Sequence, residues 1–295
     1  KPNRGIEPLP NLEFKFVTAD TLIKLPEDNG QRGLFDNYEE MQELEELRND
    51  YIQSYGKKKE QLKKRFLTVQ QKMFKDQLSL FADQKSRAYQ LSTWNPFGHD
   101  KSDWFDSKWM FGIEKFDVVI GNPPYVSHDK IFNTKYIKKN YNVFESFADM
   151  YCYFIEAGVN NLSDEGVLSY ITSNSFLRTN YGRPLRNFIK TKTDIVELID
   201  VEDSQLFGNA VVNTAIINLT KNRLDREAKV VNATYDLKTN FNSFVTNNYF
   251  CYRQADFKIN SSWSLLKPDI LKLIDKIYDE CVTLEGLGTK IRLGI

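Results

Sequence analysis

Cysteine and histidine are scarce in this 295-residue sequence, which holds three cysteines and two histidines. Cys152, Cys251 and Cys281 lie far apart, form no CxxC pair and have few histidines to complete a metal site. The pattern therefore argues against a bound metal, and isolated thiols are typical of a reducing cytoplasm. The sequence also lacks a signal-peptide pattern and an apolar run of about eighteen residues. We therefore predict no membrane association.

Charge of one sign is also lacking, because forty lysine and arginine residues balance forty aspartate and glutamate residues. The chain has no global positive field to indicate a nucleic-acid partner, so any such surface would have to be local. Hydrophobic residues make up 41%, charged residues 27% and aromatic residues 14%, which is typical of a soluble globular protein. The length accommodates one large domain or one domain and part of a second.

The first third of the chain combines a strand pattern with a long helical one. Residues 12–17 (LEFKFV) alternate apolar and charged side chains, which predicts a β-strand. From about residue 38 to 91, apolar residues recur at spacings of three and four, which predicts two amphipathic helices with a break at Gly56. The first helix is acidic and the second begins with a basic run. We therefore expect an antiparallel helical hairpin, inserted at about residues 37–92.

The basic run from Lys57 to Arg65 has two interpretations. It forms a solvated helix face, which is the commoner arrangement, or it contacts the phosphates of a nucleic acid. The sequence leaves both open.

Strands and helices alternate in the middle of the chain, which predicts an α/β fold with a mostly parallel sheet. A continuous apolar run at 116–120 is typical of a buried parallel strand, and it delivers the residues GNPPY at its carboxyl end. The elements predicted after it are a helix at about 149–161, strands at 166–172, 194–201 and 211–220, and a helix at 175–190.

Periodicity is lost beyond Arg223, where polar residues dominate up to an amphipathic helix at 269–281. We therefore predict a catalytic domain over residues 1–222. Residues 223–295 are predicted to be a linker and the start of a second domain.

Asn122, Pro123, Pro124 and Tyr125 form the segment with the most distinctive chemistry. The two prolines fix φ and lack backbone N–H groups, and Asn122 is extended because it precedes a proline. The segment therefore presents hydrogen-bond acceptors, namely the Asn122 side-chain oxygen and main-chain carbonyls. An exocyclic nucleobase amine has a delocalised lone pair and two N–H donors. Two fixed acceptors would hold those protons and favour the pyramidal nitrogen that attacks a methyl group.

Tyr125 adds a flat aromatic face on which an extruded base can stack, worth about 1–3 kcal/mol per base. This energy is comparable to the cost of flipping a base out of a duplex. The alternative is structural, because Asn-Pro often starts a turn after a core strand. The tetrapeptide alone leaves both interpretations open.

Longer blocks around the tetrapeptide resemble a known family. FDVVIGNPPYV is similar to motif IV of the adenine-N6 DNA methyltransferases. WNPF and DWFDSKWMFG are similar to the stretch that precedes this motif in type IIG restriction-modification enzymes. The resemblance runs from PLPNLEFKFVTADTLI, through DMYCYFIEAGVNNLSDEGVLSYITSNSFLRTNYGRPLR, to DSQLFGNAVVNTAIINL. Several blocks in the expected order thus cover nearly the whole chain.

The resemblance implies a bacterial, cytoplasmic enzyme of a restriction-modification system. Such an enzyme transfers a methyl group from S-adenosylmethionine to adenine N6 in double-stranded DNA and flips the target base. It also implies a Rossmann-like α/β sheet of seven strands, of which this chain supplies the third to the seventh and lacks the first two. The glycine-rich turn that binds the cofactor in this family is absent before Asp20. We therefore expect the parent protein to continue upstream, and the isolated chain to bind cofactor weakly or not at all and to be inactive.

The resemblance also assigns roles around the target base. Asn122 to Tyr125 match the catalytic motif, in which the tyrosine stacks on the flipped base. Phe207, in LFGNA, matches the aromatic residue on the opposite side of that base, with a plain loop aromatic as the alternative. Ser173 and Asn174 either line the same pocket or cap the helix that follows them.

Two residues match cofactor-binding positions of the family. Asp20 matches the acidic residue that accepts a hydrogen bond from the adenine amino group of the cofactor, and its alternative is a helix N-cap. Phe154, in YCYFIEA, matches an aromatic residue that packs on the same adenine, and its alternative is a core residue of an amphipathic helix. No metal is implied.

Two rival functions remain open. Release-factor glutamine methyltransferases also use an NPPY segment, since a glutamine amide poses the same lone-pair problem. The helical insertion, the WNPF block and LEGLGTKIRLGI, which resembles the opening of a target-recognition region, argue against that rival. The other rival is a non-catalytic nucleic-acid-binding or scaffold protein in which the tetrapeptide is structural.

Overall fold

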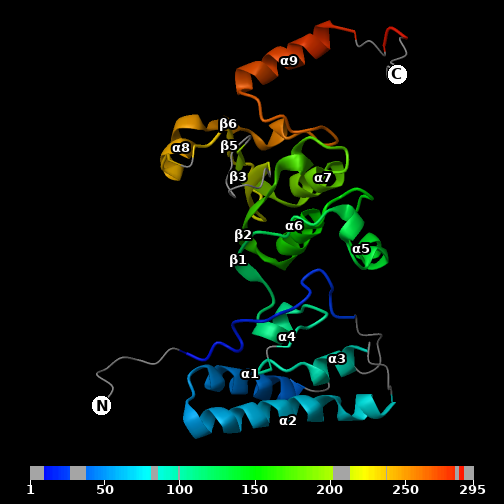
Figure 1. Cartoon of the computed structure of the whole chain (residues 1–295), viewed down its shortest axis with the longest axis vertical. Helices are drawn as coiled ribbons and strands as arrows, with labels where there is room; N and C mark the ends of the chain where they lie inside the picture. Colours follow the sequence, from blue (N-terminus) through cyan, green and yellow to red (C-terminus); the bar gives the residue numbers. More distant parts are fainter. Residues whose placement is uncertain are drawn as a thin grey trace. The chain divides into compact units, whose positions relative to one another are not determined.

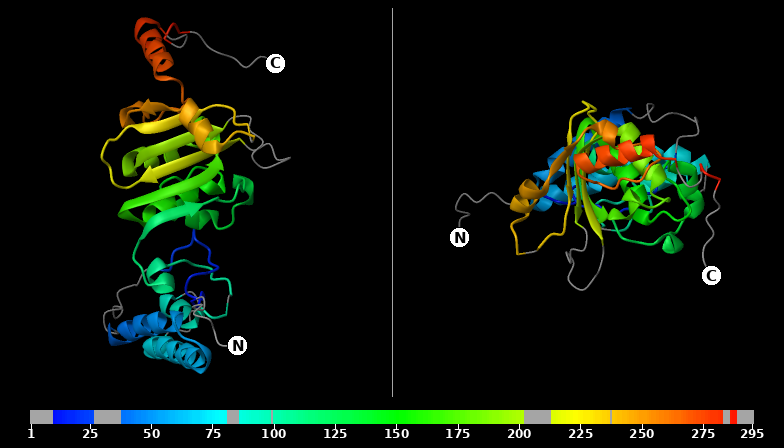
Figure 2. Two further views of the ribbon diagram at one scale, coloured as in Figure 1. Left: turned by 90° about the vertical axis from the view of Figure 1, so that its left-hand side faces the viewer. Right: turned by 90° about the horizontal axis from the view of Figure 1, so that it is seen from above.

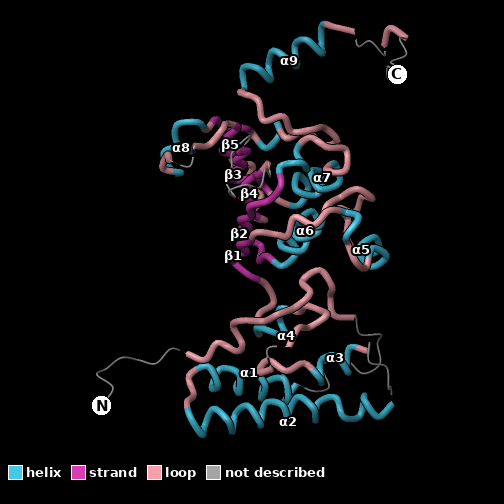
Figure 3. Tube along the Cα trace, in the orientation of Figure 1, coloured by secondary structure: helices cyan, strands magenta, loops and turns pink. Residues whose placement is uncertain are grey.

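The computed structural model describes residues 10–26, 38–80, 86–98, 100–201, 213–236, 238–282 and 286–288. The chain divides into two compact units, Lys1–Lys115 and Phe116–Ile295. Figure 1 labels their helices and strands, and Figure 3 distinguishes the two kinds of element by colour. The functional boundary near residue 222 stays a prediction.

The first unit is helical, with α1 (Tyr38–Ile52), α2 (Gly56–Leu80), α3 (Arg87–Thr93) and α4 (Ser107–Phe111). α1 and α2 lie side by side (Figure 1). They run antiparallel, because Glu43 pairs with Arg65 and Glu40 pairs with Lys72. Gly56, at the start of α2, has a φ of 57°, a left-handed conformation that glycine adopts without strain. The predicted helical hairpin with its break at Gly56 is confirmed.

Aromatic side chains fill the interior of the first unit. The Phe14 ring lies 5.6 Å from Tyr51 of α1 and 5.2 Å from Phe66 of α2, measured between ring centroids. Phe97 is in ring contact with all three. Edge-on and tilted pairs at this spacing attract beyond the effect of buried area alone, so this cluster joins the N-terminal segment to both helices.

The strand predicted at residues 12–17 is wrong. Residues 13–15 form a turn, in which the Lys15 and Phe16 amides both donate to the Leu12 carbonyl, at 2.8 Å and 3.0 Å. No strand in the described part of the chain runs beside this segment, so its alternating pattern has no ladder to join. Phe14 packs inward instead, and Phe16 stays 68% exposed.

The second unit is built on a six-stranded mixed sheet, as far as the structure describes it, with the order β1-β2-β4-β3-β5-β6. The strands are β1 (Phe116–Gly121), β2 (Leu162–Ser173), β3 (Asp194–Val201), β4 (Thr214–Thr220), β5 (Ala228–Asn232) and β6 (Phe250–Tyr252). The predicted α/β class is confirmed, and β1 to β4 are the four strands predicted from 116 onward.

The sheet is not mostly parallel, which corrects the prediction. β1 and β2 are parallel, as are β3 and β5, but β4 runs antiparallel to both of its neighbours and β6 runs antiparallel to β5. β4 follows β3 after the connection 202–213 and pairs with it directly. The sequence did not predict this direction, because side chains alternate with a period of two in parallel and antiparallel strands alike.

Helices cover the two faces of this sheet unequally. α6 (Met150–Asn161) and α7 (Arg183–Lys192) lie on one face, and α8 (Phe241–Asn248) lies on the other, at the β5 end (Figure 2). The remaining elements are α5 (Thr134–Asn140), α9 (Pro268–Glu280) and the short 3-10 helices η2 (His128–Lys130), η3 (Asn174–Leu177) and η4 (Gln254–Asp256).

Some predicted boundaries change. The helix predicted at 175–190 is split into η3 and α7, because the chain turns tightly at Gly182, directly before α7 begins at Arg183. A Cβ at Gly182 would lie 2.2 Å from the Phe176 carbonyl oxygen, so only glycine fits there. β5, α8 and β6 were not predicted, since they are too short to show a clear period.

β1 is an edge strand and not the buried strand that its apolar run predicts. It stands first in the strand order, and β2 is the one strand that pairs with it among the described residues. Val118 and Ile120 are 62% and 77% exposed. They lie on the face that α6 does not cover, because side chains alternate between faces along a strand and Gly121 faces Tyr170 beside α6.

Candidate functional site

The Asn122–Tyr125 segment directly follows β1, at the carboxyl edge of the sheet. Gly121 pairs in parallel register with Tyr170 of β2, and a Cβ at Gly121 would lie 3.1 Å from the Tyr170 ring. Glycine therefore allows the two strands and this buried ring to approach closely just before the motif. The carboxyl edge is where ligands bind in open α/β sheets.

The motif is presented to solvent. Asn122 and Pro124 are exposed, Pro123 is buried, and Tyr125 is 37% exposed. Partial burial raises the pKa of the Tyr125 phenol, so the ring is uncharged at neutral pH. The segment thus consists of a buried proline that anchors the loop, with an amide and an aromatic face outside it.

Hydrogen bonds attach the chain after the motif to the start of α6. The Met150 amide donates to the Val126 carbonyl at 2.9 Å, and the His128 amide donates to Oδ1 of Asp149 at 3.2 Å. The other carboxylate oxygen of Asp149 accepts from the Tyr181 hydroxyl at 3.4 Å. Asp149 therefore links the loop after the motif to the segment before α7.

A buried polar network lies at the same edge of the sheet. Asp200, near the end of β3, is fully buried, and its two carboxylate oxygens accept from the Asn174 amide at 2.7 Å and the Arg178 guanidinium at 2.9 Å. The Asn174 main-chain amide donates to the Asn213 carbonyl at 3.0 Å, just before β4. The network fixes η3 against the ends of two other strands.

The structure places the other residues predicted around the target base in different settings. Ser173 caps η3, with its hydroxyl accepting from the Ser175 amide at 3.3 Å, so the capping alternative describes it. Asn174 is 4% exposed, and its side chain holds Asp200. Phe207 lies outside the described residues. Its role as a stacking partner stays a prediction.

Phe154 is placed on α6, which packs on β1 and β2. It is half-buried, whereas the residues on either side of it in the helix, 151–153 and 155–159, are buried. Phe154 is therefore not enclosed as an ordinary core residue is, but its proposed contact with a cofactor stays a prediction.

Asp20 belongs to the first unit, where it closes a turn. Its amide donates to the Ser102 carbonyl at 2.9 Å, and its Oδ1 accepts from the Leu22 amide at 3.2 Å. The side chain is half-buried, and residues 21–23 form a turn and a bend, not a helix. The carboxylate thus caps a turn and not a helix, so the helix N-cap alternative is not confirmed, and the contact of Asp20 with a cofactor stays a prediction.

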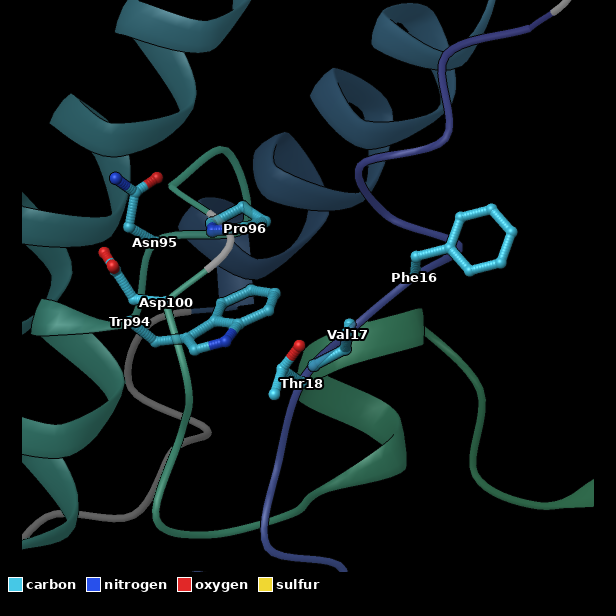
Figure 4. Close-up of a pocket in the computed structure, with 7 residues that line it drawn as sticks. All are labelled: Phe16, Val17, Thr18, Trp94, Asn95, Pro96 and Asp100. Carbon is cyan, nitrogen blue, oxygen red and sulfur yellow. The ribbon is translucent and has the colours of Figure 1, made fainter.

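A small pocket lies beside the segment that leads to Asp20. Its volume is about 240 Å³, and Figure 4 shows the residues around it: Phe16, Val17, Thr18, Trp94, Asn95, Pro96 and Asp100. Trp94 and Pro96 are buried, whereas the Phe16 ring points away from the others. Small-molecule sites usually measure roughly 300–1,000 Å³, and the volume of this pocket lies below that range.

Sequence reasoning missed Asp149, Tyr181, Arg178 and Asp200. Asp200 could have been identified from the sequence, because it is the acidic residue of an otherwise apolar run (LIDV) at the end of a predicted strand. The other three occur in polar or mixed stretches, where single acidic, aromatic and basic residues are too common to single out. Their roles depend on hydrogen bonds with residues at least 21 positions away.

Cys152 is a buried free thiol, and Cys251 and Cys281 are exposed free thiols. Within the described ranges, no three histidine, cysteine or acidic side chains form a group suited to a metal ion. No helix in that part of the chain has the length and apolar character needed to cross a bilayer.

The chain is similar to several curated proteins over part of their length. The type II methyltransferase M.BstVI of Geobacillus stearothermophilus is 28% identical over 187 residues, which cover 59% of this chain and 31% of that protein. The type II restriction enzyme and methyltransferase RM.Eco57I of Escherichia coli is 29% identical over 172 residues, which cover 54% of this chain and 16% of that protein. The type II methyltransferase M.XhoI of Xanthomonas vasicola is 25% identical over 196 residues, which cover 61% of this chain and 36% of that protein. The chain thus spans between 16% and 36% of the length of these relatives.

The family model of the Eco57I restriction-modification methylases matches residues 22–207, more than half of the chain. The matched range includes the Asn122–Tyr125 segment, α6 with Phe154, and Asp200 with its hydrogen-bond partners. The relationship predicted from the sequence is therefore confirmed, and the chain belongs to the Eco57I restriction-modification methylase family.

Proposed function

We propose that the protein to which this chain belongs transfers a methyl group from S-adenosylmethionine to N6 of adenine in double-stranded DNA. This would be the modification activity of a type IIG restriction-modification system, acting in the cytoplasm where bacterial DNA lies. The observation that carries the proposal is the exposure of Asn122 and the partial exposure of Tyr125 at the carboxyl edge of the sheet. A base can reach a motif presented in this way.

The motif's acceptors fit an adenine amine. The Asn122 side-chain oxygen and a main-chain carbonyl of the motif would accept the two N6 protons, which draws the nitrogen lone pair out of conjugation with the ring. In the transfer, N6 would bond to the methyl carbon as the bond between that carbon and its sulfur broke, and N6 would then release one proton to solvent. S-adenosylmethionine, when bound, supplies the electrophilic methyl group.

Tyr125 supports the same step through its aromatic face. Its ring is uncharged, partly buried and held next to two prolines, so it loses little conformational freedom when a base stacks on it. Asp149 keeps the following loop attached to α6 through the His128 amide. We infer that this attachment holds the motif in position when DNA binds.

The chain supplies only part of a cofactor site in this proposal. Asp20 and Phe154 are candidates for contacts with the cofactor adenine, but the sequence before Asp20 has no glycine-rich turn. The exposed Val118 and Ile120 agree with a larger catalytic domain, because parallel strands are normally buried on both faces. We infer that other residues of the whole protein cover this face and complete the site.

Substituting Asn122→Ala in the whole protein tests the proposal. We expect the rate of N6-methyladenine formation to fall by about 100- to 1,000-fold, as when one preorganised transition-state hydrogen-bonding group is removed. DNA binding, measured separately by fluorescence anisotropy, should persist. The matched control is Asn140→Ala, which removes an exposed asparagine at the end of α5 and should methylate normally.

Three outcomes would contradict the proposal. Asn122→Ala with full activity would exclude the role given to the motif. A wild-type protein that methylates a protein glutamine and not DNA would be a release-factor-type methyltransferase. A wild-type protein that binds DNA without methylating anything would be a scaffold.

A further inference from the structure

The exposed surface of α2 is strongly basic, although the whole chain has no net charge. α2 carries eight basic and two acidic residues, whereas the neighbouring α1 carries six acidic and one basic. The basic residues on the exposed positions of α2 are Lys57, Lys58, Lys64, Arg65, Lys72 and Lys75. Charge is therefore segregated between the two helices of the hairpin.

Interactions within the first unit account for some of these cations. Arg65 and Lys72 pair with Glu43 and Glu40 of α1. Lys59, which is half-buried, pairs with Glu13. Among the described residues, no ion pair or ring contact is seen for Lys57, Lys58, Lys64 or Lys75. These four lysines, here called the outer lysines, do not serve the packing of the hairpin.

Two of the outer lysines destabilise the helix that carries them. Lys57 and Lys58, with Lys59, occupy the first turn of α2, which holds no acidic residue. The N-terminal end of a helix carries partial positive charge, so lysines there are unfavourable and acidic residues are favoured. A local arrangement that weakens its own element without a structural gain is typical of a functional surface. A bound anion would offset both the dipole and the repulsion between the lysines.

Three of the outer lysines, Lys57, Lys64 and Lys75, share one face of α2, and Lys58 lies next to Lys57 in the first turn. Positions 57, 61, 64, 68, 71 and 75 recur at spacings of three and four and are all exposed, so they form one continuous face. From Lys57 to Lys75 the helix rises about 27 Å. That length equals roughly eight base pairs of duplex DNA, a polymer with one phosphate charge per about 1.7 Å of axis.

We propose that the outer lysines of α2 bind the phosphate backbone of duplex DNA, on a surface that does not include the Asn122–Tyr125 motif. The inference rests on the proposed function for its choice of DNA as the anion. We assign the lysines to phosphates and not to base edges, because a lysine ammonium acts mainly as a point charge on a flexible stem and contacts of this kind carry no sequence information. Their contribution is therefore independent of sequence and dependent on salt.

The test compares two triple variants of the whole protein. The first is Lys57→Gln, Lys58→Gln and Lys64→Gln, which spares the lysines paired in the hairpin. The matched control is Lys267→Gln, Lys272→Gln and Lys276→Gln, which removes the same charge from the region of α9, a helix that also carries Asp269, Asp275, Asp279 and Glu280. Dissociation constants for a long duplex are measured over a series of salt concentrations.

We expect the slope of log affinity against log salt to fall in magnitude by about 2–3 in the α2 variant, or about 0.9 for each phosphate that is no longer neutralised. Its affinity at low salt should fall by at least about 10-fold. The control should change the slope by less than about one unit. The melting temperature of the α2 variant should equal or exceed that of the wild type, because lysines at a helix N-terminus are removed.

A wild-type slope in the α2 variant would overturn the inference and would leave an acidic protein surface as the partner of α2. An equal weakening in the control would also overturn it, since net charge alone would then explain the effect. Failure of the proposed function is seen separately, as the absence of N6-methyladenine in the wild type. A difference in slope between the two variants would still support DNA binding by α2 in that case.

Discussion

The two compact units bury polar groups in different ways. In the described part of the chain, the buried polar side chains of the first unit are serines and Gln70, all uncharged. The buried charged side chains, Glu156, Arg186, Asp194 and Asp200, all belong to the second unit. None of the ion pairs described in the first unit has a fully buried partner. They range from the half-buried pair of Lys59 and Glu13 to that of Arg65 and Glu43, whose side chains are 59% and 35% exposed.

This difference reflects the kind of backbone that each unit stabilises. The aromatic cluster of the first unit stabilises helices, which satisfy their own backbone hydrogen bonds. The second unit must fix irregular segments, whose backbone groups need other partners. Glu156 accepts from the Asn142 and Val143 amides, and Arg186 donates to the carbonyls of Phe176, Thr179 and Ser261. Buried charge is thus used where loops around the sheet must keep one conformation.

The largest expected effect is on the aromatic cluster of the first unit. Phe66→Ala should destabilise this unit by about 4 kcal/mol, because the 2% exposed ring fills space against Phe14 and Phe97 and leaves a cavity when truncated. Hydrogen exchange over residues 38–80 measures the destabilisation. Thr68→Ala, an exposed position on the same helix, is the control and should have little effect. Normal protection in Phe66→Ala would show that the cluster is not the source of stability.

A smaller effect is expected for the buried charge of the second unit. Arg186→Met should cost about 3 kcal/mol, because it leaves three backbone carbonyls without their donor. Burial and the nearby Arg183 lower the pKa of Arg186, yet its guanidinium stays charged. Urea unfolding of the chain measures the change.

Arg183→Met is the matched control for that prediction, since it removes the same charge from an exposed position of α7. It should leave stability unchanged or raise it slightly, because it relieves repulsion on Arg186. If Arg186→Met is as stable as the wild type, a well-packed apolar residue can replace the buried charge. The buried charge of the second unit would then not be a source of its stability.

The smallest effect concerns the pH dependence of the first unit. Burial acts to raise the pKa of Glu13, but hydrogen bonds from Lys59 and Tyr51 outweigh it and hold the pKa below its ordinary value of 4.5. The resulting stability is present above pH 4.5 and disappears as the pH falls through the lower, folded-state value. Urea unfolding between about pH 6 and 3 should therefore show a shallower decline in Glu13→Gln than in the wild type.

Glu46→Gln is the control for the pH experiment, because Glu46 is exposed on α1 and forms no ion pair in the described part of the unit. It should follow the wild-type pH dependence. An identical acid response in Glu13→Gln would show that the hydrogen bonds of Glu13 do not stabilise the folded state.

The sequence predicted elements well where a long period repeats. The hairpin of α1 and α2 and its break at Gly56 were predicted, and so was β3, at residues 194–201. The Asn122–Tyr125 segment was singled out because its two prolines and its asparagine follow an apolar run. The prediction failed at residues 12–17, where a strand pattern had no partner strand, and at β5 and β6, where the pattern is too short to detect.

Local sequence therefore determined the helices, most of the strands and the position of Asn122 to Tyr125, because backbone preference and side-chain periodicity act over a few residues. Only the tertiary structure decided that β1 lies at an edge, that β4 inserts antiparallel between β2 and β3, and that Asp200 meets Asn174 and Arg178. Those features depend on interactions between residues far apart in the chain, and neither propensity nor spacing specifies such interactions.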